Sequence, residues 1–221
     1  MEGAQGIAEA LGPPVLIEHL LHTAESHVVV QRAIREGVAV DRVSDEVMQR
    51  LTSTVTPQGL VAIAPFVDVD LDAIPDPAQC IAVLHEVRDP GNAGTVLRSA
   101  DGAGADAVVF TASSVDVYNQ KTVRASAGSV FHLPIVRDVD TTASVGRLRD
   151  RGFRVCATAA GGDVDLFELD LRPATAFLFG NEAWGLPKDV ADLADVTVRV
   201  PLTGRAESRS EERRVGKECR L

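Results

Sequence analysis

The sequence predicts an α/β fold in which a mostly parallel sheet follows a small α/β domain. From residue 79 onward, short apolar runs alternate with helical patterns. Such near-continuous apolar strands are typical of parallel strands that helices cover on both faces. An acidic stretch with prolines at residues 67–78 is typical of a linker. Before it, helical and strand patterns alternate over a shorter segment, which predicts the second, smaller unit.

Residues 1–66 are expected to form the small domain, which would bind the substrate. Helices are predicted at 3–11, 24–36 and 45–51, and strands at 14–21, 38–43 and 59–66, the last of them buried. Ser44 is a suitable N-cap for the third helix, and Asp45 or Glu46 favours its N-terminus. Because the domain opens directly on a helical pattern, we expect a first strand to be missing from it.

Residues 79–208 are expected to form the large domain. Its predicted strands are Cys80–Val87, Ala105–Phe110, Val130–Val136, Phe153–Thr158, Thr175–Phe179 and Val196–Pro201. Its predicted helices are Ala93–Gly102, Gln120–Ala127, Thr141–Arg151 and Pro187–Leu193. In parallel sheets of this kind, ligands bind beyond the carboxyl ends of the strands. Functional residues are therefore expected in the loops that directly follow the strands.

The loop after the first of these strands runs from Asp89 to Ala100. Pro90-Gly91 predicts a turn, and Asn92 is suited to an N-cap. Arg98 lies nearly two turns into the following helix, and the alternative for it is a solvated helix arginine. The glycines do not form the G-x-G-x-x-G pattern of dinucleotide-binding loops.

The loop after the strand at 175–179 reads Gly180-Asn181-Glu182-Ala183-Trp184-Gly185-Leu186-Pro187. Gly180 permits close backbone approach and Gly185 a tight turn. Glu182 places a carboxylate directly beyond an apolar strand. The alternative is that Asn181 and Glu182 only turn the chain and cap the helix that opens at Pro187.

The loop after the last strand reads Val200-Pro201-Leu202-Thr203-Gly204-Arg205-Ala206-Glu207-Ser208. A strand that ends in proline before a Thr-Gly turn is common. This loop indicates little by itself.

Taken together, the three loops resemble the three signature motifs of the SpoU (TrmH-like) family of RNA 2′-O-ribose methyltransferases. Asn92 with Arg98 is similar to the first motif, Gly180-x-Glu182-x-x-Gly185 to the second, and Val200-Pro201-Leu202-x-Gly204-x-x-Glu207-Ser208 to the start of the third. Residues 119–129 resemble the family's stretch between its first two motifs, and residues 56–62 resemble part of its substrate-binding domain. The likeness covers roughly residues 2–208.

The resemblance implies a sheet whose C-terminal part forms a deep trefoil knot of the SPOUT type. It also implies S-adenosyl-L-methionine as the cofactor, bound in the knot largely by backbone groups. The implied cofactor-binding residues are Thr158, Ala159, Gly180, Glu182, Gly185, Val200, Pro201 and Leu202, and Ala160 and Gly161 are expected to help. The family's members work as homodimers, with the active site near the dimer interface.

The implied reaction transfers a methyl group from a sulfonium to a ribose 2′-hydroxyl of ribosomal or transfer RNA. This hydroxyl is a very weak acid, so an enzyme must orient it and help its proton leave. Because a guanidinium stays charged, Arg98 is expected to position the ribose and a phosphate, and to stabilise the developing oxyanion. The implied catalytic residues are Arg98, Asn92, Glu182 and Ser208. Lys121 and Arg124 are candidate RNA contacts, and the alternative is that they only solvate a helix.

The composition is consistent with a cytoplasmic enzyme. No apolar run is long enough to span a bilayer, and the N-terminus does not resemble a signal peptide. The cysteines and histidines show no metal-binding spacing, so we expect neither a metal nor a membrane partner. The net charge of −10 argues against general nucleic-acid binding. We therefore expect only a local basic patch to meet the RNA.

Residues 209–221 depart from the family pattern. A leucine, an asparagine and an alanine-rich helix are expected after Ser208, but the chain continues with Arg209 and a charged segment. We expect this tail to be foreign, and a genuine charged tail is the alternative. The incomplete third motif leaves open a non-catalytic RNA-binding protein on the same fold. A Rossmann-type enzyme with a nucleotide cofactor is a third alternative, disfavoured by the missing fingerprint loop.

Overall fold

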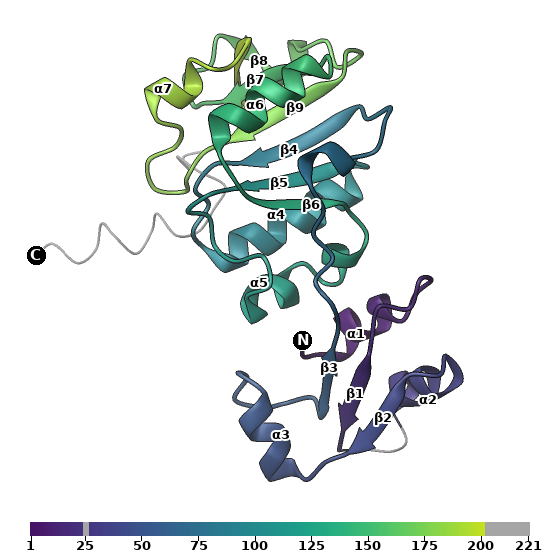
Figure 1. Cartoon of the computed structure of the whole chain (residues 1–221). Coiled ribbons are helices and arrows are strands. Elements are labelled where there is room, and N and C mark those ends of the chain that lie inside the picture. The colour runs from purple at the N-terminus through teal and green to yellow at the C-terminus, as the bar shows by residue number, and fades with distance from the viewer. Residues whose placement is uncertain (24–26, 202–221) are drawn as a thin grey trace, which may run out of the picture.

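The computed structural model describes residues 1–23 and 27–201, which form two α/β domains (Figure 1). The elements of the small domain are α1 (Ala4–Ala10), β1 (His19–His22), α2 (Val28–Arg35), β2 (Ala39–Arg42), α3 (Asp45–Leu51) and β3 (Leu60–Ile63). Its sheet has the order β2-β1-β3, with β1 parallel to β2 and antiparallel to β3. The predicted alternation of helices and strands is confirmed.

In the small domain one predicted cap is confirmed, and two predicted strands have different bounds. The Ser44 hydroxyl accepts a hydrogen bond from the backbone N–H three residues on at 3.3 Å, so the predicted N-cap of α3 is confirmed. The strand expected at 14–21 begins only at His19. The strand expected to be buried through Phe66 ends at Ile63, and the Phe66 side chain is 70% exposed. β3 pairs with β1 on one side and forms an isolated bridge from Val61 to Glu2 on the other. Its buried side chains, Leu60 and Ala62, pack with α1 and α2.

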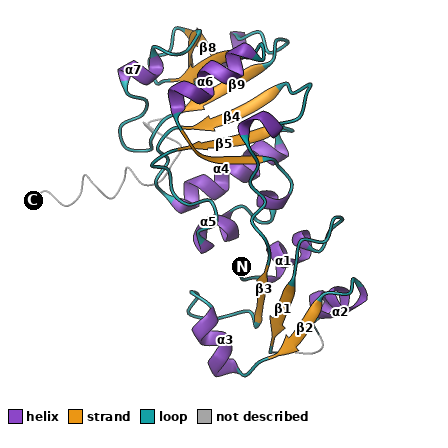
Figure 2. Ribbon diagram, viewed as in Figure 1, coloured by secondary structure: helices purple, strands orange, loops and turns teal. Residues whose placement is uncertain are grey.

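The large domain is built on a seven-stranded sheet (Figure 2). Its strands are β4 (Cys80–Leu84), β5 (Ala107–Thr111), β6 (Ile135–Val139), β7 (Arg154–Thr158), β8 (Val164–Asp165), β9 (Thr175–Phe179) and β10 (Val196–Arg199). They lie in the order β6-β5-β4-β9-β7-β10-β8, and every neighbouring pair is parallel. This confirms the predicted α/β fold with a mostly parallel sheet. The trefoil knot stays a prediction, because the chain beyond Pro201 lies outside the described residues.

The helices of the large domain fall close to their predicted positions. They are α4 (Pro90–Gly102), α5 (Gln120–Ala125), α6 (Thr141–Asp150) and α7 (Lys188–Ala191), with 3-10 turns η1 (Leu71–Ala73), η2 (Ser129–Phe131) and η3 (Leu166–Glu168). The strand predicted at Val130–Val136 is wrong in its first half, which forms η2 after Gly128 at a φ of +105°. The strand β8 was not predicted, because two residues are too few to produce a pattern.

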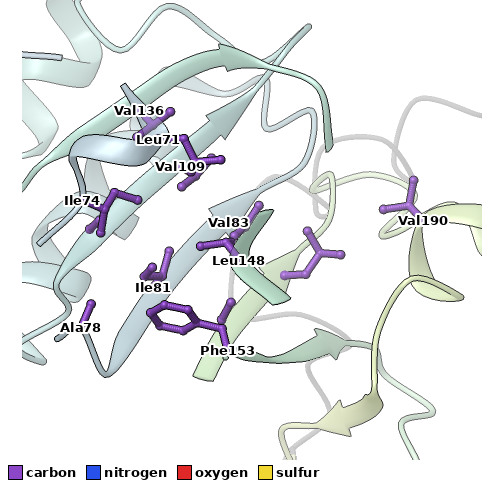
Figure 3. Close-up of a cluster of buried hydrophobic side chains, with 13 residues drawn as sticks. Leu71, Ile74, Ala78, Ile81, Val83, Val109, Val136, Leu148, Phe153 and Val190 are labelled. Atoms are coloured by element: carbon purple, nitrogen blue, oxygen red, sulfur yellow. The ribbon is translucent and has the colours of Figure 1, made fainter. Parts of the chain in front are cut away.

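Apolar side chains cover the parallel sheet on both faces. Along β4, Ile81 and Val83 face one layer while Ala82 and Leu84 face the other, as the period of two requires. One layer joins the sheet to α6, α7 and η1 through Leu71, Ile74, Ala78, Val109, Val136, Leu148, Phe153 and Val190 (Figure 3). The other joins it to α4 and α5 through Val87, Leu97, Val108, Phe110, Val123 and Val130. This two-sided burial explains why the strands read as continuous apolar runs.

The acidic segment at residues 67–78 connects the domains but is also packed. Leu71 and Ile74 are buried in the core of the large domain. The backbone N–H of Val69 donates to the carbonyl of Ile135 at 2.8 Å, beside the edge strand β6. The segment therefore continues the large domain and leaves little free chain between the two units.

Tyr118 of the large domain holds the start of this segment. Its hydroxyl accepts hydrogen bonds from the backbone N–H groups of Val67 and Asp68, each at 2.8 Å, and donates to the Asp68 carboxylate at 2.8 Å. Burial, together with the adjacent Asp68 carboxylate, raises the pKa of Tyr118 to about 12. The hydroxyl therefore stays protonated and keeps donating. Phe66 stacks on the Tyr118 ring at a centroid distance of 4.4 Å.

The two domains also meet directly. The buried Glu2 accepts a hydrogen bond from the backbone N–H of Ser53 at 3.2 Å, and Arg124 of α5 forms an ion pair with the same carboxylate. A Cβ atom at Gly128 would lie 2.3 Å from the side chain of Glu9, so glycine permits the close approach of α1 to the large domain. These contacts fix how the small domain sits beside the large one.

The contact between α4 and α5 depends on Gly94. A Cβ atom at this position would lie 2.5 Å from the Ala125 side chain and 2.5 Å from the Thr122 carbonyl. We predict that Gly94→Ala forces the helices apart and destabilises the protein by about 1–3 kcal/mol. Thermal melting measures the change. Gly102→Ala is the control, because it lies in the same helix with nothing within 4 Å of its Cβ position. Equal melting temperatures for the two variants would contradict this packing.

Candidate active site

The loops predicted to carry the function follow the carboxyl ends of neighbouring strands, on one side of the sheet. β4, β9, β7 and β10 are consecutive neighbours and all parallel. Their carboxyl ends therefore lie side by side, which brings together the segments after Leu84, Phe179, Thr158 and Arg199. Of the predicted cofactor-binding residues, the structure places Thr158, Ala159, Gly180, Glu182, Gly185, Val200 and Pro201 at these strand ends. Leu202 and Ser208 lie outside the described residues.

The loop after β9 is a tight turn closed on itself. The backbone N–H of Asn181 donates to the carbonyl of Gly185 at 3.0 Å, and the N–H of Gly185 donates back at 2.8 Å. Gly185 has a φ of +75°, which favours glycine. A Cβ atom at Gly180 would lie 2.3 Å from the carbonyl carbon of Gly185 and 2.4 Å from the nitrogen of Leu186. The close approach predicted for Gly180 is therefore made to the loop's own backbone.

Two polar side chains fasten this loop to the loop after β4. The Glu182 carboxylate accepts hydrogen bonds from the backbone N–H groups of Arg88 at 3.3 Å and Asp89 at 3.2 Å. The Asn181 amide, 5% exposed, donates to the carbonyl of Glu86 at 2.7 Å. Glu86 adopts a φ of 50°, a conformation that non-glycine residues hold only where the surroundings impose it. The alternative in which Asn181 and Glu182 cap α7 is wrong, because α7 has Pro187 at its N-cap and no side-chain cap.

Asp89, and not Asn92, caps α4. Its carboxylate accepts a hydrogen bond from the backbone N–H of Asn92 at 2.7 Å and from the Lys121 ammonium at 3.1 Å. Burial opposes ionisation of Asp89, but these hydrogen bonds and the Lys121 charge keep its pKa below the ordinary value. Asn92 stands third in the helix, so its prediction as the N-cap is wrong. Its side-chain nitrogen is buried and has no hydrogen-bond partner among the described residues, which leaves a donor for a ligand.

The three predicted cations differ in their surroundings. Arg98 is exposed on α4 and makes no hydrogen bond or ion pair with a described residue. Lys121 lies at the start of α5 and pairs with Asp89, which places it against the first turn of α4. Arg124 faces the small domain, where it contacts Glu2 and the Ser53 hydroxyl. The structure thus gives Arg124 a contact between the domains, while RNA contact by Lys121 and Arg124 stays a prediction.

The loop after β7 lies directly against β10. The backbone N–H of Ala159 donates to the carbonyl of Val198 at 2.9 Å, and a Cβ atom at Gly162 would lie 2.4 Å from the Val198 carbonyl carbon. The Thr158 hydroxyl donates to the carbonyl of Leu178 at 3.1 Å, so its side chain supports the sheet. Ala159, Ala160 and Gly161 are exposed and have small side chains, which leaves their backbone open to a ligand.

The sequence patterns assigned neither Asp89 nor Asn181 a role in holding these loops together. Asn181 joins the loop after β4 through a contact with Glu86, which lies 95 residues away in the chain. The cap at Asp89 is local, because its carboxylate accepts the backbone N–H of Asn92. The Asp-Pro pair at 89–90 was the available signal, since aspartate is a preferred cap before a proline at the first helical position.

The part of the chain that the structure describes contains two free cysteines. Burial raises the pKa of the Cys80 and Cys156 thiols, as expected for cysteines that act as small apolar side chains. Among residues 1–23 and 27–201 no group of histidine, cysteine, aspartate and glutamate side chains could hold a metal ion. Within the same residues no helix is long and apolar enough to cross a membrane.

Family models match the chain over nearly all of its described length. Residues 79–208 match the SpoU rRNA Methylase family, and residues 1–68 match the RNA 2′-O ribose methyltransferase substrate binding domain. The chain belongs to the SpoU rRNA methylase family.

Relatives and solved structures of SpoU methylases agree with this assignment. The chain is 32% identical to the 23S rRNA (guanosine(2553)-2′-O)-methyltransferase RlmP of Bacillus subtilis, over 94% of this chain and 81% of the relative. The crystal structure of an AdoMet-bound rRNA methyltransferase from Sinorhizobium meliloti superposes with a TM-score of 0.80 and 34% identity, covering 95% of this chain and 80% of that one. The SpoU methyltransferase AviRb of Streptomyces viridochromogenes, in complex with AdoMet, gives a TM-score of 0.81 and 30% identity, with coverages of 95% and 83%.

We predict that Gly180→Ala opens the turn after β9. The added Cβ atom would overlap backbone atoms of Gly185 and Leu186. Backbone atoms cannot rotate away as a flexible side chain can. The affinity for S-adenosyl-L-methionine, measured by isothermal titration, should fall more than about tenfold, which equals about 1.4 kcal/mol. Gly146→Ala on α6, with nothing within 4 Å of its Cβ position, is the control. An unchanged affinity in Gly180→Ala would place the cofactor elsewhere.

Proposed function

We propose that this chain transfers a methyl group from S-adenosyl-L-methionine to a ribose 2′-hydroxyl of ribosomal RNA. The observation that carries the proposal is the junction of Asn181 and Glu182 with residues 86–89. It joins the loop after β9 to the segment that begins α4. The cofactor loops and the helix bearing Asn92 and Arg98 thereby form one connected site.

The residues at the sheet edge fit a cofactor that is held by backbone groups. The loops after β7 and β9 approach other backbone closely at Gly162 and Gly180, and glycines and alanines leave their main chain accessible. We assign cofactor binding to Thr158, Ala159, Gly180, Glu182, Gly185, Val200 and Pro201, with Leu202 continuing the third motif. When bound, the cofactor supplies a methyl group on a positively charged sulfur, which a weak nucleophile can attack.

The chain's own task is to present the hydroxyl. The Arg98 guanidinium carries no partner among the described residues, so it is available to hold a phosphate and to stabilise negative charge on the attacking oxygen. The unpartnered amide of Asn92 supplies a further donor. Glu182 acts as a positioning residue, because its carboxylate holds the backbone of Arg88 and Asp89. Ser208 completes the proposed set through the third motif.

Ribosomal RNA is the proposed substrate because the family and two of the relatives are named for it. The RlmP relative and the 23S rRNA (uridine(2479)-2′-O)-methyltransferase of Streptomyces viridochromogenes, 35% identical over 74% of this chain, are both named for it. The small domain matches a substrate-binding model. With a net charge of −10, phosphate contact must be local, and we assign part of it to Lys121 and Arg124. We further propose a cytoplasmic location and a homodimeric state, and sedimentation analysis tests the homodimer.

The deciding experiment is methyl transfer from labelled cofactor to total unmodified RNA, followed by mapping of the modified nucleotide. Label on a ribose oxygen of ribosomal RNA supports the proposal. Label on transfer RNA would correct the substrate. RNA binding without either cofactor binding or label would support a non-catalytic RNA-binding protein instead.

We predict that Arg98→Ala lowers the rate of methyl transfer about 100- to 1,000-fold, the range for loss of one group that stabilises developing charge. Its folding should be unchanged, because Arg98 is exposed and unpartnered among the described residues. The measurement is single-turnover methyl transfer together with a melting curve. Arg172→Ala, which removes an exposed arginine before the amino end of β9, is the control. A rate equal to that of the wild type would remove Arg98 from the mechanism.

A further inference from the structure

Trp184 is the single tryptophan of the chain and lies at the rim of the proposed site. It stands in the turn after β9, two residues beyond Glu182. Its side chain is 55% exposed. Tryptophan is a large, mostly apolar side chain that proteins usually bury to a high degree. An exposed tryptophan in a loop that shapes a site is therefore a candidate contact for a ligand.

Arg88 lies over this tryptophan. Its guanidinium carbon is 5.4 Å from the centre of the Trp184 ring, within the range of a cation–π contact. The guanidinium also pairs with the Glu86 carboxylate at 3.2 Å, yet the Arg88 side chain remains 58% exposed. The charge is therefore in reach of a further anion.

The backbone holds the two side chains together. Glu182 accepts the backbone N–H of Arg88, and Asn181 bonds to the carbonyl of Glu86. The same hydrogen bonds that join the loop after β9 to the segment before α4 therefore hold Trp184 and Arg88 next to each other. A ring and a cation fixed at this position can act together on one nucleotide.

The chemistry of the pair selects single-stranded RNA. Unpaired bases stack on aromatic rings and on guanidinium planes, whereas paired bases keep their faces inside the helix. A guanidinium beside the ring can also bind the phosphate of the same nucleotide. The combination matters here because the chain carries a net charge of −10, which disfavours contact with RNA elsewhere on its surface.

We propose that the Trp184–Arg88 pair stacks an unpaired base next to the nucleotide that receives the methyl group. This inference rests on the proposed function for its RNA substrate. It restricts that substrate to a loop, bulge or strand end whose bases are free to leave the stack. A second copy of the chain covering Trp184 is the competing explanation for the exposed ring.

Intrinsic fluorescence tests the pair directly, because the only tryptophan is Trp184. The full chain is titrated with a mixed-sequence single-stranded oligoribonucleotide and with a duplex of the same length. We expect quenching by the single strand and little change with the duplex. Equal responses to both, or no response to either, would overturn the proposal. An emission shift on concentrating the protein without RNA would also overturn it, since a second copy would then cover the ring.

Variants separate this inference from the proposed function. Trp184→Ala should weaken binding of the single strand about 5- to 150-fold, the range for loss of one stacked base, while the affinity for S-adenosyl-L-methionine stays unchanged. Trp184→Phe should recover part of the loss. Leu171→Ala, an exposed apolar side chain before the amino end of β9, is the control. Unchanged binding in Trp184→Ala overturns the stacking role, whether or not the wild type methylates ribosomal RNA. Failure of methylation alone, with quenching intact, would overturn only the proposed function.

Discussion

The hydrogen bonds from Asn181 and Glu182 to residues 86–89 are the interaction on which the site depends. The ends of parallel strands leave backbone groups without ladder partners, and these groups need other hydrogen-bond partners. In this protein the Glu182 carboxylate satisfies two N–H groups of the neighbouring loop, and the Asn181 amide satisfies a carbonyl. Three side-chain contacts across β4 and β9 thereby set where α4 begins and where the turn after β9 lies.

This constraint also explains the strained backbone beside the site. Glu86 holds a positive φ and its carbonyl is the acceptor for Asn181. A strained residue persists where its surroundings determine its conformation. Here the Thr111 hydroxyl accepts the Glu86 N–H at 3.3 Å, so both backbone groups of the residue are engaged. Glu86, in the loop that leads to α4, is therefore held by Thr111 of β5 and by Asn181 in the loop after β9.

The sequence was informative wherever a pattern was local. The apolar runs of β4, β5, β7 and β9 were predictable because burial on both faces removes polar residues from them. The Ser44 cap followed from residue type and position. The strand through Val130 was not predictable, since a 3-10 turn there is as apolar as a strand and only Gly128 distinguishes it.

The positions of the loops were more predictable than the contacts between them. Alternating strands and helices put the functional loops at the carboxyl edge, and the resemblance selected Gly180, Glu182 and Asn92. The contact of Arg124 with Glu2 joins segments 122 residues apart, and no spacing in the sequence encodes it. The cap at Asp89 is local, and the Asp-Pro pair at the start of α4 was its sequence signal. The stacked geometry of Trp184 on Arg88 likewise comes from the fold.

The packed segment between the domains holds the two domains at a fixed separation. Leu71 and Ile74 anchor it in one core, Tyr118 clamps its start, and Arg124 ties the small domain to α5. The small domain is therefore held in one position relative to the large domain. Two surfaces at a fixed separation act as a ruler, so a ligand that contacts both domains must match that distance.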